Sequence, residues 1–290
     1  MTDHSFPTRT PRDDEVDVYG LSHTGKVRKE NQDHFLVATF HRSINVLYSN
    51  LDDPQQRLPQ DAHRLAFVAM VADGVGGGVG GGEASATALE AAMNYVHGSV
   101  TAYYGAQANE SELRELLQSA AMQAHEAVKQ RREAQGVRGT MATTLTLYFG
   151  VWPTYYLLQV GDSRYYLWRD GVLRQVTRDQ TMAQDLVDQG AMSMATAERT
   201  PFKHVLSSAL GSDTTIPVVT RHESHWDNVH LLCSDGLTKH VSDARIAEVL
   251  GTMTSARQAA EQLLHDALDG GGTDNITIMV ARTVPKDPAS

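Results

Sequence analysis

The sequence contains a single cysteine and no long apolar run. Cys233 has no partner for an intrachain disulfide, which is typical of chains that fold in a reducing compartment. The longest uninterrupted apolar stretch, residues 65–72, is far below the roughly 20 residues that span a bilayer. Residues 1–17 are polar and lack the apolar segment of a signal peptide. We therefore expect a cytoplasmic protein with no membrane partner.

Basic residues are also scarce. The 290 residues include 25 Lys plus Arg against 35 Asp plus Glu, which gives a formal net charge of −10. Nucleic-acid binding normally needs a basic surface, so we expect no nucleic-acid partner. The 13 histidines show no H-E-x-x-H spacing, and no Cys/His array indicates a zinc site. The hydrophobic fraction of 41% is sufficient for a substantial core.

Strand-like and helix-like stretches alternate along the chain without a long linker. This predicts one domain over residues 16–284, between a flexible N-terminal tail (1–15) and a short C-terminal tail (285–290). The polar stretch 41–64 contains two prolines and predicts a surface excursion. Strands arrive both as hairpins and separated by helices, so we expect an α+β fold in which helices cover mixed or antiparallel sheets.

The expected elements follow from residue type and periodicity. β-branched, aromatic or continuous apolar stretches predict strands, and Ala-rich stretches with spaced apolar residues predict helices. The predicted strands are 16–21, 33–39, 65–72, 143–149, 155–160, 165–168, 172–176, 229–233 and 276–280. The predicted helices are 83–97, 110–134, 243–250 and 255–268, and residues 177–213 are expected to be helical and irregular. Asp170-Gly171 predicts a tight hairpin turn.

Aspartates stand at the ends of five of these strands. They are Asp33, Asp73, Asp162, Asp235 and Asp274. A carboxylate at the end of a buried strand is costly to desolvate unless it is paired with a cation or binds a metal. If all five meet in one cleft, their repulsion requires cations, and oxygen ligands suit Mg²⁺ or Mn²⁺. Each of them is equally compatible with an ordinary turn, because Asp favours turns.

Six strings around these aspartates carry a family resemblance. They are residues 28–33 (RKENQD), 71–77 (VADGVGG), 139–145 (GTMATTL), 161–164 (GDSR), 232–237 (LCSDGL) and 273–277 (TDNIT). In these strings, and in their order from about residue 16 to 284, the chain resembles the protein phosphatase 2C family in its bacterial form. Members are metal-dependent protein serine/threonine phosphatases. The family fold is an α-β-β-α sandwich of two antiparallel sheets flanked by helices.

The resemblance assigns roles to individual residues. Asp73 would bridge two Mn²⁺ or Mg²⁺ ions and act in catalysis, and the carbonyl of Gly74 would bind one of the ions. Asp235 and Asp274 would complete the shell of the first ion, and Asp33 would support the second. Asp162, with Asp235, would hold a weaker third ion. Arg28 would bind the substrate phosphate and act in catalysis, and residues 177–213 would form the flap beside the cleft.

The implied chemistry is hydrolysis of phosphoserine and phosphothreonine. Two neighbouring ions lower the pKa of a shared water and orient it for attack on phosphorus, and a guanidinium such as that of Arg28 binds two phosphate oxygens at once. The implied partners are phosphorylated proteins, the targets of a serine/threonine kinase. Two alternatives remain: a silent binding module with the same fold, and a phosphatase of small phosphate esters. All the metal aspartates are present, which favours an active enzyme over the silent module.

Three features depart from the family pattern. Val75 stands where eukaryotic members place a histidine proposed as general acid, so no residue is assigned to protonate the leaving alcohol. The glycine run 76–82 is one residue longer than usual, and Asp179-Gln180-Thr181 replaces the Asp-His-Ser of the flap. Asn275 opens a formal glycosylation sequon, to which we assign no role. Cys233 is expected to be a buried strand residue.

Overall fold

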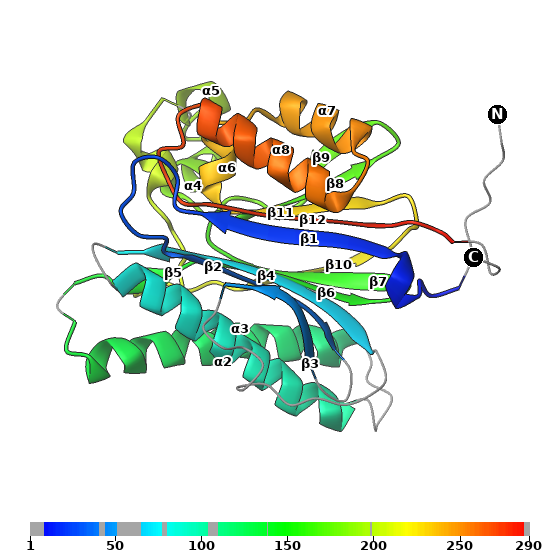
Figure 1. The fold of residues 1–290 in the computed structure, drawn as a ribbon. Coiled ribbons are helices and arrows are strands. Elements are labelled where there is room, and N and C mark those ends of the chain that lie inside the picture. Colours follow the sequence, from blue (N-terminus) through cyan, green and yellow to red (C-terminus); the bar gives the residue numbers. More distant parts are fainter. Residues whose placement is uncertain are drawn as a thin grey trace.

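Two antiparallel sheets pack face to face, and helices cover both outer faces (Figure 1). The computed structural model describes residues 9–40, 44–50, 65–76, 80–103, 110–137, 139–197 and 199–286. This α-β-β-α sandwich confirms the expected fold class. Among the described residues, no helix combines the length and apolar character needed to cross a membrane.

The smaller sheet has the strand order β1-β12-β11-β8-β9, and the larger has the order β10-β7-β6-β4-β2-β3, with β5 paired to β4. The strands are β1 Val16–His23, β2 Asp33–Phe40, β3 Ile44–Ser49, β4 Ala66–Val75, β5 Ala142–Thr143, β6 Leu145–Val151, β7 Thr154–Val160, β8 Arg164–Arg169, β9 Val172–Gln175, β10 Val218–Glu223, β11 Val229–Cys233 and β12 Ile276–Thr283. The helices are η1 Asp13–Glu15, α2 Gly80–Tyr103, α3 Glu110–Ala134, α4 Met182–Asp188, α5 Met194–Ala197, η2 Pro201–His204, α6 Asp235–Thr238, α7 Asp243–Thr252 and α8 Ala256–Asp269.

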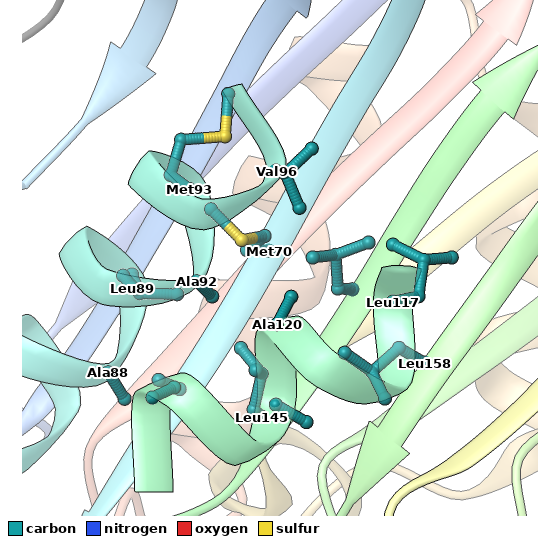
Figure 2. Close-up of a cluster of buried hydrophobic side chains, with 14 of the residues drawn as sticks. Met70, Ala88, Leu89, Ala92, Met93, Val96, Leu117, Ala120, Leu145 and Leu158 are labelled. Atoms are coloured by element: carbon teal, nitrogen blue, oxygen red, sulfur yellow. The ribbon is translucent and has the colours of Figure 1, made fainter. Parts of the chain in front are cut away.

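The largest of three buried clusters lies between the larger sheet and the helices α2 and α3 (Figure 2). Met70 and Leu145 of the sheet belong to this cluster together with Leu89 of α2 and Ala120 of α3. Small side chains at such positions let the helices approach the sheet closely, while the larger side chains fill the remaining space. This packing fixes the larger sheet, whose strand ends carry Asp33 and Asp73.

Two further clusters complete the layers. The first lies between the sheets and includes Phe35, Val71, Leu232 and Met279. The second lies between the smaller sheet and α7 and α8. Each strand buried between two such layers carries apolar residues on both faces, which explains why 65–72 reads as an unbroken apolar run.

Most expected elements are present, but two strands were missed. β3 lies inside the stretch 41–64 that we interpreted as a surface excursion, so that interpretation was wrong for Ile44–Ser49, and residues 51–64 lie outside the described residues. β10 was missed because four of its six residues are exposed at the sheet edge. The Asp170-Gly171 hairpin is confirmed, with both residues at positive φ (51° and 79°) as a type I′ turn requires.

Residues 9–15 of the predicted tail make defined contacts. The buried carboxylate of Glu15 accepts hydrogen bonds from the side chain of Arg9 and from the backbone N–H groups of Arg12 and Lys286, at 2.8 and 3.1 Å for the last two. The two ends of the described chain are therefore joined beside β1. The flexibility of the tail and the exact domain boundaries stay predictions.

Candidate metal centre

All five strand-end aspartates lie at one end of the sandwich, where β5 and α6 appear in Figure 1. Asp33 opens β2 and Asp73 lies near the end of β4, and the two are directly opposite each other in the antiparallel register. Asp162 follows β7, Asp235 follows β11, and Asp274 precedes β12. Antiparallel neighbours bring the start of one strand beside the end of the next, so both sheets deliver carboxyl groups to the same end.

Asp33 lies behind the cleft and is almost fully buried. Its Oδ2 accepts hydrogen bonds from Ser234 Oγ (2.7 Å) and Thr277 Oγ1 (2.8 Å), which belong to the smaller sheet side of the site. Its Oδ1 is buried and has no hydrogen-bond partner among the described residues. These contacts join the two sheets through one carboxylate and leave one of its oxygens free to accept a ligand.

The other four aspartates line a cleft with two adjoining parts of about 730 and 530 Å³. Asp162, Asp235 and Asp274 line both parts, together with Arg28, and Asp73 lines the larger. Within the described part of the chain, the Oδ1 of Asp235 is buried without a hydrogen-bond partner, as is that of Asp33. The convergence that the sequence alone left open is therefore present in the fold.

Gly74 lies where only glycine fits. A Cβ at this position would be 2.2 Å from the carbonyl oxygen of Gly81 and 2.7 Å from that of Gln32, which no side chain tolerates. A Cβ on Gly81 would in turn approach the Gly74 carbonyl oxygen to 2.9 Å. The glycines on the two sides of this turn thus keep the backbone beside Asp73 compact. Residues 77–79 of the glycine run lie outside the described residues.

Arg28 is held by Asp274. Its Nε lies 2.7 Å from Asp274 Oδ1 and an Nη lies 2.9 Å from Oδ2, so the guanidinium forms a two-point contact with the carboxylate. The loop that carries Arg28 is fixed by Asn275, whose amide donates to the carbonyls of Thr24 (3.0 Å) and Glu30 (2.9 Å). Asn275 Oδ1 also accepts from the backbone N–H of Gln32 at 2.8 Å.

Burial and mutual repulsion raise the pKa values of the carboxyls deepest in the site. Burial, with the nearby charges of Asp235 and Asp274, raises the pKa of Asp33 to about 7 against the hydrogen bonds from Ser234 and Thr277. Burial, together with Asp235 and Asp179, raises the pKa of Asp162 to about 8. The pKa of Asp73 is raised well above its ordinary value by burial and then by neighbouring aspartates.

Asp274 behaves in the opposite way. Burial alone would raise its pKa, but hydrogen bonds and charge from Arg28 and Lys239 outweigh burial and hold the pKa below its ordinary value. One side of the cleft therefore has its negative charge offset by basic side chains. The other side, around Asp33, Asp73 and Asp162, lacks enough positive charge to keep its carboxyls ionised.

These observations fit divalent ions. Two buried carboxylate oxygens without partners, a set of hard oxygen donors and raised carboxyl pKa values all indicate a missing positive charge. As they stand, no three acidic, imidazole or thiol side chains of the described residues are gathered closely enough to hold an ion. Both oxygens of Asp274 are engaged in ion pairs, with Arg28 and with Lys239.

Comparison with known proteins decides the family. The model of the family described as Protein phosphatase 2C matches residues 52–269. The chain belongs to the protein phosphatase 2C family. The serine/threonine phosphatase stp of Listeria monocytogenes is 31% identical over 214 residues, which cover 73% of this chain and 83% of that protein.

Two comparisons concern proteins named PstP, and the first of these proteins is the PstP of Mycobacterium tuberculosis. Its sequence is 40% identical over 147 residues, and these cover 51% of this chain but 28% of the curated PstP protein. The crystal structure of the catalytic domain of PstP in complex with two manganese ions has a TM-score of 0.71 at 30% identity, and the match covers 93% of this chain and 99% of that one. Over 93% of its length, this protein phosphatase 2C chain therefore shares the fold of a solved catalytic domain in complex with two manganese ions.

The sequence reasoning missed several residues of the site. Ser234 and Thr277 bond Asp33, Asn275 fixes the Arg28 loop, and Lys239 contacts two of the aspartates. Lys239 was detectable in principle, because it stands four residues after Asp235 in a helical turn, the spacing at which side chains meet. Asn275 belongs to the family string 273–277 and opens a sequon, but neither pattern indicates its contacts with the Arg28 loop.

In the segment 177–213, where the resemblance predicts a flap, the residue that departs from the family pattern contacts the site. Gln180 is buried, and its Oε1 accepts a hydrogen bond from the backbone N–H of Gly161 at 2.7 Å, next to Asp162. Its Nε2 donates to the Ile216 carbonyl at 2.9 Å. Beside it, Arg164 makes a two-point contact with Asp179, with an Nη 2.7 Å from Oδ2. The amide of Gln180 thus fixes the predicted flap segment beside Asp162, at the position where the family pattern has a histidine.

Proposed function

We propose that this chain is a metal-dependent protein phosphatase that hydrolyses phosphoserine and phosphothreonine in proteins. The observation that carries the proposal is the convergence of four aspartates and Arg28 on one cleft with Asp33 behind it, and two buried carboxylate oxygens there have no hydrogen-bond partner among the described residues. Family membership supports it, and PstP and stp are both named as serine/threonine phosphatases. All five proposed metal aspartates are present, which disfavours a catalytically silent binding module.

The aspartates and Gly74 would hold Mn²⁺ or Mg²⁺. We propose Asp73 as the residue shared by two ions, the Gly74 carbonyl, Asp235 and Asp274 on the first, and Asp33 supporting the second. Asp162, with Asp235, is proposed for a weaker third ion. When bound, such ions supply an activated water and offset the negative charge of the phosphoryl group.

Arg28 is proposed to bind the substrate phosphate. Its two-point contact with Asp274 shows that the guanidinium presents two donors toward the cleft, the geometry that suits two phosphate oxygens. More than half of its side chain is exposed, so it can exchange Asp274 for a ligand without crossing the core. Arg28 would thereby hold the phosphorylated residue above the aspartates while excluding part of its hydration shell.

The experiment is phosphate release from a phosphothreonine peptide, with Mn²⁺ present and then with the metal chelated. Turnover that disappears on chelation and returns with Mn²⁺ would support the proposal. Absence of turnover in folded protein with saturating Mn²⁺ would favour the silent binding module. A higher kcat/KM for p-nitrophenyl phosphate than for any phosphopeptide would favour a phosphatase of small esters.

The substrates are proposed to be targets of a serine/threonine kinase, and the cytoplasmic location expected from the sequence belongs to the same proposal. A phosphoproteome comparison with and without the protein tests both. Phosphoserine and phosphothreonine peptides from cytoplasmic proteins should increase when it is removed.

A further inference from the structure

Lys239 places a positive charge among the proposed metal ligands. It directly follows the short helix α6, which begins at Asp235, and its side chain is only 24% exposed. The Nζ lies 2.5 Å from Asp235 Oδ2 and 2.6 Å from Asp274 Oδ2. One ammonium group therefore bridges two carboxylates that arrive from different strands.

These contacts occupy atoms that a metal ion would need. Asp274 has both oxygens engaged: Oδ1 by Arg28, and Oδ2 by Lys239 and Arg28. Asp235 has Oδ2 engaged by Lys239, whereas its Oδ1 is buried without a partner. A divalent ion coordinated by Asp235 and Asp274 would lie within a few ångströms of the ammonium, and the two cations would repel each other in a partly buried site.

The lysine has room to withdraw. Lys239 lines both parts of the cleft, so its flexible four-carbon stem borders open space on either side of the carboxylates. Withdrawal would break two ion pairs but would not disturb the packed core, because the contacts of the side chain are to groups on the cleft wall.

We infer that Lys239 is a tethered counter-cation, which stabilises the metal-free cleft by bridging Asp235 and Asp274 and must leave them when an ion binds. The inference rests on the proposed metal site and adds a regulation to it. Lys239 would weaken the affinity for Mn²⁺, so that the site fills only at higher concentrations of free metal. It would also keep the metal-free protein folded despite its clustered carboxylates.

The test compares the wild-type chain with its Lys239→Met variant, in which the side chain keeps an apolar stem but loses its charge. Mn²⁺ affinity is measured by isothermal titration calorimetry, and Tm is measured in chelator. We expect Lys239→Met to bind Mn²⁺ about tenfold more tightly, because a close like charge is gone, and to melt at a lower temperature without metal.

A matched control separates this contact from a general change of charge. Lys203 also lines the cleft, but no ion pair of its ammonium is found among the described residues. Lys203→Met should change the Mn²⁺ affinity by less than about threefold. Lys239→Arg retains the charge and should keep the weak affinity of the wild type.

Each outcome decides the inference. If the wild type binds Mn²⁺ and Lys239→Met binds it equally well or more weakly, the inferred role of Lys239 is wrong. The proposed metal site is then unaffected. Failure of the wild type itself to bind Mn²⁺ overturns both. If Lys239→Met does not fold in chelator, Lys239→Gln, which keeps a hydrogen-bond donor, takes its place, and the same increase in affinity is required.

Discussion

The space between the two sheets has two ends that bury polar groups in different ways. At the metal end, Asp33 and Asp235 each keep a buried oxygen that has no hydrogen-bond partner in the described ranges. Toward the other end, Tyr165 and His230 bond each other, with 2.6 Å between the hydroxyl and Nδ1. Tyr155 lies against the same imidazole, with ring centroids 5.7 Å apart. One end holds ionisable carboxyls, and the other holds neutral rings.

The difference lies in what completes each end. Burial lowers the pKa of His230 to about 4, so its ring is neutral at pH 7 and its hydrogen bond needs no external partner. The carboxyls of the metal end repel one another until cations arrive. The aromatic end can therefore support the fold in any state of the protein, whereas the stability of the metal end depends on metal and pH.

The largest expected effect comes from removing one charge at the metal end. Asp73→Asn should lower kcat by about 10³-fold or more, because the residue proposed to join two ions no longer binds them. The same change should raise Tm in chelator, since it removes a buried carboxyl whose pKa is raised by burial and by its neighbours. Phosphopeptide turnover and thermal melting measure the two effects.

Asp170→Asn is the matched control, because it makes the same substitution in an exposed hairpin turn. It should leave both kcat and Tm in chelator close to those of the wild type. Full activity of Asp73→Asn would contradict the assignment of the site. A lower Tm in chelator would contradict the idea that the metal end is destabilised by its own charges.

The two ends should also respond oppositely to pH. Asp33 and Asp162 have folded-state pKa values of about 7 and 8, above the ordinary value near 3.9 of the unfolded chain. At a pH between the unfolded-state and folded-state pKa values, the folded state binds more protons than the unfolded state. The free energy of unfolding in chelator should therefore fall by roughly 2–4 kcal/mol from pH 6 to 8. Saturating Mn²⁺ should remove this slope, because the ligands then stay ionised.

At the aromatic end, the free energy of unfolding is expected to fall as the pH is lowered, the reverse of the metal end. The folded-state pKa of His230 is lowered to about 4, so below pH 6.5 the unfolded state binds a proton that the folded state does not. This group should cost about 2 kcal/mol of stability as the pH falls from 6.5 to 4. Chemical denaturation of wild type and His230→Phe across this range isolates the contribution. Identical slopes in the two proteins would refute it.

The comparison of ends also shows what the sequence predicts well. The aspartates were found because each stands beside a continuous apolar or β-branched run, a local pattern that marks a strand end. Their convergence was not predictable from spacing, since it depends on the register that places Asp33 opposite Asp73. Family resemblance provided that long-range information, and the fold agrees with it.

The contacts made by ordinary-looking residues were not predictable. Ser234, Thr277 and Asn275 are small polar residues in or beside strands, and although they lie in the family strings, nothing local indicates which groups they contact. The exposed edge strand β10 was missed for a similar reason, because its alternation of exposed and half-buried residues is weak. Such features depend on partners distant in sequence, which a local pattern does not contain.

A smaller effect is expected at the basic side of the metal end. Arg28→Ala should raise KM for a phosphopeptide about tenfold or more, because the two-point phosphate contact is lost. The Mn²⁺ affinity should change less than KM, since the side chain is 53% exposed and its charge is well screened. Arg257→Ala, on an exposed helix face, is the control. An unchanged KM would show that Arg28 does not bind the phosphate.

The smallest effect tests the neutral contact at the aromatic end. Tyr165→Phe removes the hydroxyl that bonds His230 and leaves a buried imidazole nitrogen unpaired, which should cost about 1–2 kcal/mol of unfolding free energy. The loss should be the same with Mn²⁺ and in chelator, because this end needs no cation. Tyr156→Phe, on another buried tyrosine, should cost less than about 0.5 kcal/mol. A loss for Tyr165→Phe that depends on metal would mean that the two ends are energetically coupled through the sheets.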